Sequence, residues 1–194
     1  NFDISAAEII DPENYAGFDE MVNTMVELRK GKQTAEECTA LLKKSNYFGT
    51  MLVKMGKADC LLGGATYSTA DTVRPALQII KTAPGITCVS GAMLLLTIAP
   101  ECGDNGILVM GDVAVTPVPD ANQLAQIAVC TARTAQAVAG ITPRVAMLSF
   151  STKGSAKHEV VDKVVEAFKI AKEMDPSLLI DGELQADAAL VPSV

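Results

Sequence analysis

Short apolar runs alternate with amphipathic helical patterns along this chain, and this alternation constrains its fold more than any other feature. Residues 145–150 form an apolar run of strand length, and residues 160–168 repeat their apolar side chains at helical spacing. A further short strand is predicted at 178–180, after Pro176. Strands that alternate with helices are typical of an α/β fold with a largely parallel sheet, which we therefore predict.

Helical patterns dominate the first part of the chain. Apolar residues at helical spacing predict a short helix over 18–29, and the capping box of Thr34 and Glu37 predicts the start of a second, longer helix. The apolar run 58–62 predicts a strand that ends at a pair of glycines, after which a helix begins near Ser68. This part is therefore expected to supply a strand, a glycine loop and a helix.

Pro84-Gly85 interrupts both patterns, and we place a domain boundary there. Residues 1–84 are predicted to form part of a first α/β domain, and residues 85–194 a second, incomplete α/β domain. No internal repeat or low-complexity tract is visible, which argues against solenoids and long linkers.

Beyond this boundary a hairpin and a capped helix are predicted. Apolar runs at 87–98 and 107–111 have the character of buried strands, and Gly103-Asp104-Asn105-Gly106 is suited to the turn between them. Asp120 is placed to cap the amphipathic helix that follows.

The charge balance argues against a broad nucleic-acid-binding face. The formal net charge is −7, whereas such a face needs clustered lysine and arginine. A small anionic ligand held in a local pocket remains compatible with this charge. The most apolar stretch, residues 91–99, is far shorter than the roughly 20 residues that span a bilayer, so no membrane segment is expected.

The cysteines lie far apart and include no C-x-x-C pair, so neither a zinc site nor a disulfide framework is predicted. Reduced thiols favour a cytoplasmic location. Cys102 lies in a predicted turn with no histidine near it in sequence, and we interpret it as structural or incidental. The five cysteines are Cys38, Cys60, Cys88, Cys102 and Cys130.

The first polar segment that suits an anion is 67–75, which follows two glycines and begins a helix. A helix N-terminus offers free N–H groups, while Ser68, Thr72 and Arg74 add donors. The alternative is a capped helix whose hydroxyls satisfy their own backbone and whose arginine lies on a solvated face. The pattern by itself leaves both interpretations open.

A second such segment, 149–155, lies between an apolar strand and an amphipathic helix. Its hydroxyl groups, Lys153 and Gly154 again suit a phosphate, although the spacing of a Walker A loop is absent. A polar loop with a serine cap is the alternative.

A third segment, 179–187, leaves the end of a strand, where ligands gather in open α/β sheets. Here we favour a turn in which Asp181 and Glu183 cap the following helix. His158 is interpreted as a solvated residue on an exposed helix face. The basic cluster at 29–32 closes a helix, where it complements the dipole, although it also suits a ligand phosphate.

Taken together, these segments resemble the phosphate acetyltransferase family, and the resemblance covers essentially the whole chain. The similar stretches are VELRK (26–30), STADTVRPALQIIKT (68–82), VAMLSFSTKGS (145–155) and IDGELQ (180–185).

The resemblance implies two α/β domains with a cleft between them, similar to isocitrate and isopropylmalate dehydrogenases, and a homodimer. It also implies coenzyme A or acetyl-CoA and acetyl phosphate or phosphate as substrates, with no bound cofactor and no metal. Arg29 and Arg74 match arginines of the family's coenzyme A and phosphate site. Four further residues lie in the matching cleft segments and are expected to bind substrate, without a specific role for each: Ser68, Thr72, Lys153 and Ser155.

The chain also departs from the family pattern. Family members are longer at both ends, and near their C-terminus they carry a Ser-Arg-Gly motif and an aspartate taken as the base for the thiol. This sequence begins at Asn1 without an initiator methionine and ends at Val194 before that motif. We therefore expect a central part of a family member, truncated at both ends, that contains no catalytic residue and is inactive by itself.

The function implied by the resemblance is acetyl transfer between acetyl phosphate and coenzyme A in acetate metabolism. The thiolate attacks the acetyl carbonyl directly, and phosphate leaves from a tetrahedral intermediate. Two alternatives stay open: the non-catalytic phosphotransacetylase-like regulatory domain of a malic enzyme, and a phosphate butyryltransferase.

Overall fold

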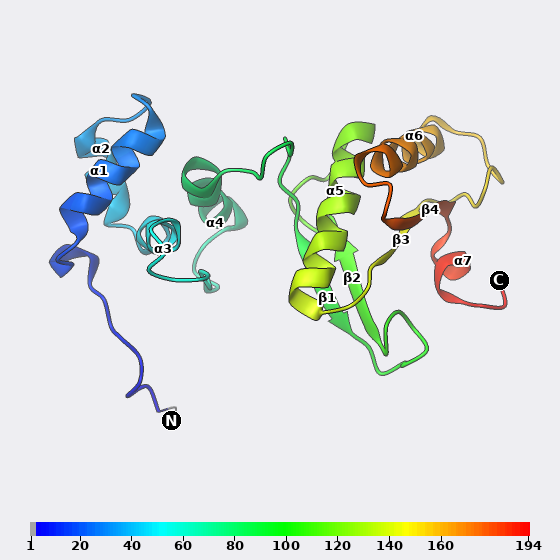
Figure 1. Ribbon diagram of the computed structural model, residues 1–194, viewed down its shortest axis with the longest axis horizontal. Coiled ribbons are helices and arrows are strands. Elements are labelled where there is room, and N and C mark those ends of the chain that lie inside the picture. Colours follow the sequence, from blue (N-terminus) through cyan, green and yellow to red (C-terminus); the bar gives the residue numbers. More distant parts are fainter. Residues whose placement is uncertain (1–2) are drawn as a thin grey trace. The chain divides into compact units, whose positions relative to one another are not determined.

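A computed structural model describes residues 3–194 of the chain, which divides into two compact units, Asn1–Ala83 and Pro84–Val194 (Figure 1). Helices and small sheets make up the chain, so the predicted α/β class is confirmed. Among residues 3–194 no helix is both long enough and apolar enough to cross a membrane.

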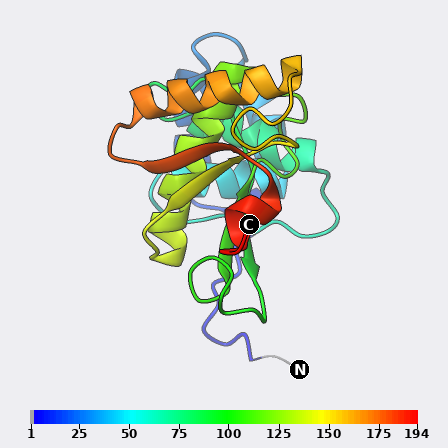
Figure 2. The same ribbon diagram turned by 90° about the vertical axis from the view of Figure 1, so that its right-hand side faces the viewer.

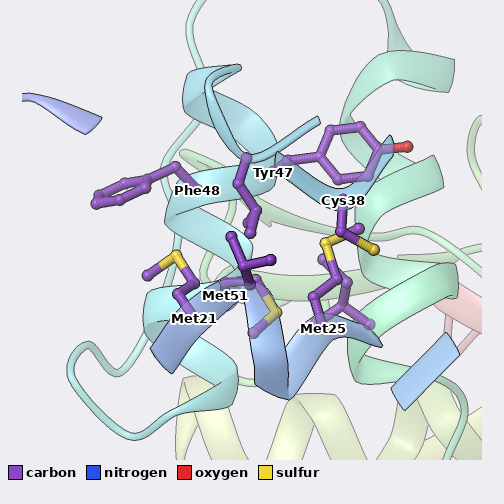
Figure 3. Packing of buried hydrophobic residues seen from close by; sticks show 9 residues of the cluster. Met21, Met25, Cys38, Tyr47, Phe48 and Met51 are labelled. Carbon is purple, nitrogen blue, oxygen red and sulfur yellow. The ribbon is translucent and has the colours of Figure 1, made fainter. Parts of the chain in front are cut away.

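The first unit is built from helices. Its elements are η1 (Pro12–Asn14), α1 (Phe18–Arg29), α2 (Ala35–Leu42), α3 (Ser45–Lys54), α4 (Thr69–Pro75) and the π-helical turn η2 (Ala76–Ile80). Its core is rich in sulfur, and Figure 3 shows the methionine side chains of α1 and α3 grouped with Cys38. Methionine is flexible enough to fill the irregular gaps between such short helices.

Local capping signals in this unit are confirmed, but one predicted helix is two. The Thr34 hydroxyl accepts from the Glu37 N–H (3.2 Å), and the Glu37 carboxylate accepts from the Thr34 N–H (2.8 Å). The helix that begins there ends at Leu42, and Lys44 adopts an extended backbone before α3 begins. This break redirects the chain so that α3 buries Phe48 in the core.

The predicted strand at 58–62 is wrong, because these residues form no regular structure and Leu62 is 94% exposed. A strand is stable only when its backbone groups pair with a neighbour. No described residue of the chain pairs with this segment.

The second unit holds all the strands that the described residues form. Its elements are β1 (Ala92–Leu96), β2 (Ile107–Gly111), α5 (Ala121–Thr134), the π-helical turn η3 (Ala135–Ala139), β3 (Arg144–Leu148), α6 (Glu159–Met174), β4 (Leu179–Leu184) and α7 (Ala186–Leu190). The α6 helix packs on α5 and β4, as Figure 2 shows from the C-terminal side. Alanines in α5 and α6 let the two helices approach closely around Met147 and Val164.

The strands form two separate pairs. β1 and β2 pair antiparallel as the predicted hairpin, and β3 and β4 pair parallel through the α6 crossover. The expected sheet, largely parallel, is therefore one parallel pair and one antiparallel pair. Burial was overestimated as well, since Leu96 in β1 is 78% exposed and only Met147 of β3 is buried.

The predicted cap of α5 is confirmed, since the Asp120 carboxylate accepts from the Gln123 N–H (2.8 Å). The parallel pairing of β3 and β4 matters most for the site. It places the carboxyl ends of both strands at one edge, so the segment after Leu148 lies beside the segment around Glu183.

Candidate anion-binding sites

Arg29 ends α1 and is held by two hydrogen bonds. Its Nε donates to the Gln33 side chain (2.7 Å), and its Nη1 donates to the Gln78 backbone carbonyl in η2 (3.2 Å). The Tyr47 hydroxyl donates to the Gln78 side chain (2.9 Å). Gln78 therefore joins α1, α3 and η2, and it fixes the half-buried Arg29 guanidinium in place.

Arg74, in the last turn of α4, is in a different state. It is exposed, and its side chain makes no hydrogen bond or ion pair with the residues from 3 to 194. Burial raises the pKa of Tyr47, and the positive charges of Arg74 and Arg29 oppose this rise. Tyr47 and Arg74 line the same pocket, and Tyr47 and Arg29 both donate hydrogen bonds to Gln78, so both predicted arginines lie close to Tyr47.

Ser68 and Thr72 serve the backbone of α4 in this structure. The Ser68 hydroxyl accepts from the Asp71 N–H (3.2 Å) and donates to the Asp71 carboxylate (2.7 Å), while the Thr72 hydroxyl donates to the Ser68 carbonyl (3.3 Å). The Ser68 hydrogen bond is the main reason that the pKa of Asp71 lies below its ordinary value. Both hydroxyls thus have local partners, as the capped-helix interpretation expects.

A pocket of about 620 Å³ opens beside Arg74 in the first unit. Three cations and one carboxylate line it, together with hydroxyl, amide and apolar groups. The lining residues are Pro12, Leu41, Lys43, Lys44, Ser45, Asn46, Tyr47, Thr66, Tyr67, Asp71 and Arg74. Its size falls within the range of roughly 300–1,000 Å³ found for small-molecule sites.

In the second unit, Glu183 lies at the carboxyl end of β4 and is only 4% exposed. Its carboxylate accepts from the Gly154 N–H (2.7 Å) and from the hydroxyl of the fully buried Ser151 (2.9 Å). The expectation that Glu183 caps the next helix is therefore wrong. Parallel pairing of β3 and β4 places Glu183 beside the 149–155 loop instead. Its carboxylate there accepts hydrogen bonds from the N–H and hydroxyl groups that were expected to bind an anionic ligand.

Lys153 and Ser155 lie together in this loop. The Lys153 ammonium forms an ion pair with Asp181 and donates to the Gly182 carbonyl (3.1 Å), so Asp181 is not a helix cap either. The Ser155 hydroxyl accepts from the Thr152 N–H (3.0 Å). Because Lys153 and Asp181 are 52% and 60% exposed, water screens their attraction and the pair is easily opened.

Both strand-end carboxyls have lowered pKa values. The Lys153 hydrogen bond is the first cause for Asp181, and the Gly154 N–H is the first cause for Glu183, where burial acts in the opposite direction. Sequence reasoning missed the role of Glu183, and the one available signal was that its segment and the 149–155 loop both follow predicted strands.

Replacing Glu183 by alanine is expected to lower the free energy of unfolding of the intact protein by about 1–3 kcal/mol. The change leaves the buried Ser151 hydroxyl and the Gly154 N–H without their acceptor. Urea unfolding measures the loss, with Glu166→Ala on the exposed face of α6 as control.

The loss should also depend on pH. A carboxyl whose folded pKa is lowered contributes stability that is fully present above its unfolded pKa, near 4.5 for glutamate, and is lost as the pH falls through the folded pKa. The difference between wild type and variant should therefore shrink below about pH 4.5. Equal stability of wild type and variant at neutral pH would contradict this role.

His158 and the cysteines add no reactive pair to these sites. His158 is exposed, as predicted, and its Nδ1 accepts from the Val160 N–H (3.2 Å) at the start of α6. The cysteines are all unpaired thiols. Within residues 3–194, no cluster of three or more histidine, cysteine or acidic side chains is arranged to hold a metal ion.

These features describe an α/β protein whose two units each present cationic and hydroxyl groups suited to anions. Residues 1–194 match the family model described as "Phosphate acetyl/butaryl transferase", and the chain belongs to this family. The resemblance noted in the sequence is thereby confirmed.

Curated relatives and solved structures support the same family. The chain is 53% identical over 193 residues to a phosphate acetyltransferase of Thermoanaerobacterium thermosaccharolyticum, covering 99% of this chain and 59% of the relative. It is 50% identical over 194 residues to that of Bacillus subtilis, covering 100% and 58%. The EutD phosphotransacetylase structure from Staphylococcus aureus matches with a TM-score of 0.88 at 50% identity, covering 100% of this chain and 58% of that one. The chain thus spans somewhat less than three fifths of the length of these relatives.

Proposed function

We propose that the intact protein is a phosphate acetyltransferase, which transfers an acetyl group reversibly between acetyl phosphate and coenzyme A. The observation that carries the proposal is the identity of about one half over the whole chain to relatives that bear this name. The malic enzyme domain and the phosphate butyryltransferase are less favoured, because these relatives are named for acetyl transfer. The family description itself covers both acyl groups.

The residues of this chain would bind and orient the two anionic substrates. Arg74 is free to pair bidentately with a phosphate group, and Arg29 is already fixed by Gln78. Lys153 would reach a substrate anion by leaving Asp181, with Ser155 beside it. Ser68 and Thr72 belong to the same proposal at the start of α4.

The chemical step is proposed as direct attack of the coenzyme A thiolate on the acetyl carbonyl of acetyl phosphate. The C–S bond forms, the C–O bond to phosphate breaks, and the thiol proton passes to a general base. We assign that base to no residue of this chain. The same proposal includes a homodimer, a cytoplasmic location, and an arrangement of two α/β domains like that of isocitrate dehydrogenase.

The proposal is tested by assaying the intact protein with coenzyme A and either acetyl phosphate or butyryl phosphate. We expect acetyl-CoA formation with a kcat/KM at least tenfold above that for butyryl transfer, since each methylene in an apolar pocket is worth roughly tenfold or more. The reverse preference would indicate a butyryltransferase. Substrate binding without any turnover would indicate a regulatory domain.

A further inference from the structure

Lys43 and Lys44 lie between α2 and α3, and both line the 620 Å³ pocket that contains Arg74. Both are exposed, and neither side chain forms an ion pair or hydrogen bond with any residue of the described part of the chain. In a chain with a net charge of −7, three cations and one carboxylate around a single pocket are a marked local excess of positive charge. Such an excess favours an anionic ligand.

The single carboxylate of the pocket does not cancel this charge. The Asp71 carboxylate accepts from the Ser68 hydroxyl, and the Asp71 N–H donates to that same hydroxyl. This one negative charge stands against the three positive charges of Lys43, Lys44 and Arg74. Lys44, Asp71 and Arg74 line the same pocket, and, after the Ser68 hydrogen bonds, the charges of Arg74 and Lys44 are among the causes that lower the pKa of Asp71. The pocket therefore keeps a net positive charge.

The shape and the other lining groups favour a nucleotide over an inorganic ion. A volume of about 620 Å³ far exceeds the space that one phosphate ion needs, and Tyr67 presents a partly exposed aromatic ring at the wall. Aromatic faces bind nucleobases by stacking. The Ser45 and Tyr67 hydroxyls contact each other beside the lysines and add hydrogen-bonding groups.

We propose that Lys43 and Lys44 bind the phosphate groups at the nucleotide end of coenzyme A, as binding residues additional to Arg74. This rests on the proposed function, because it takes coenzyme A to be the substrate. The two lysines supply point charges that follow a flexible diphosphate or 3′-phosphate, whereas the arginine supplies a rigid, bidentate contact.

The test uses the intact protein with both lysines changed to glutamine, Lys43→Gln together with Lys44→Gln. Calorimetric titration with coenzyme A should show a Kd raised roughly tenfold or more, because charge-assisted contacts to phosphate are lost. The Kd for inorganic phosphate should change less than twofold. Titration with 3′-dephospho-coenzyme A should show a smaller effect of the two substitutions if they contact the 3′-phosphate, and an equal effect if they contact the diphosphate.

The matched control changes Lys54 and Lys57 to glutamine. These exposed lysines lie at and just beyond the other end of α3, and they do not line the pocket. Their substitution removes the same amount of charge as the double variant does. If the double variant unfolds, the single variants replace it, each with an expected rise in Kd of roughly threefold or more. A Kd for coenzyme A equal to that of the control, or a loss confined to inorganic phosphate, overturns the proposal.

Failure of the proposed function has a different signature. A wild-type protein that binds coenzyme A but forms no acyl-CoA would refute the transferase, while the lysine variants would still report on the pocket. A wild-type protein that does not bind coenzyme A at all would refute both.

Discussion

Arg74→Ala in the intact protein is expected to lower kcat/KM for acetyl transfer by roughly ten- to a hundredfold. A charge-assisted hydrogen bond to phosphate contributes about 1.5–3 kcal/mol, and each 1.4 kcal/mol corresponds to a factor of about ten. The midpoint of thermal unfolding should hardly move, because the Arg74 side chain is exposed and makes no hydrogen bond or ion pair within the part of the chain that the structure describes. Steady-state kinetics with both substrates and a thermal melt measure the two effects.

Three further variants define what this result means. Arg74→Lys should recover only part of the activity, because lysine keeps the charge but loses the bidentate contact. Arg29→Ala should lower activity and stability together, since its guanidinium ties α1 to Gln78. Arg144→Ala, at the exposed start of β3, serves as the control. Normal kcat/KM for Arg74→Ala would remove this arginine from the site.

A polypeptide limited to residues 1–194 is expected to form acetyl-CoA at least a hundredfold more slowly than a protein of the relatives' length. These residues correspond to 58% or 59% of the curated relatives, and our proposal assigns the thiol base to none of them. Loss of a general base costs roughly 10²–10⁴ in rate. Thiol consumption at saturating acetyl phosphate measures the difference.

Binding distinguishes a missing base from a missing site. The polypeptide keeps Arg29, Arg74 and the pocket beside Lys44, so coenzyme A should still bind to it in a calorimetric titration. The exposed apolar side chains of β1 also predict association at high concentration, which light scattering detects. Turnover near that of the longer protein would show that the catalytic groups lie within these residues.

The sequence by itself determined those elements whose signals are local. Asp120 and Thr34 each satisfy an N–H group three residues away, so the starts of α5 and α2 were readable from neighbouring residues. The β1–β2 hairpin and the amphipathic α6 were predicted for the same reason. The family was also readable, because long matching stretches carry it.

Only the tertiary structure decided which polar side chains already have hydrogen-bond partners within the protein. Arg29 meets the carbonyl of Gln78, 49 residues away, and Glu183 meets the N–H of Gly154, 29 residues away. Periodicity does not encode such partners, because they depend on how whole elements pack. The interruption of the helix at Lys44 and the exposed segment 58–62 were predicted wrongly for the same reason. Burial and pairing are properties of the assembled chain, so the free Arg74 and the engaged Glu183 could be told apart only after it had folded.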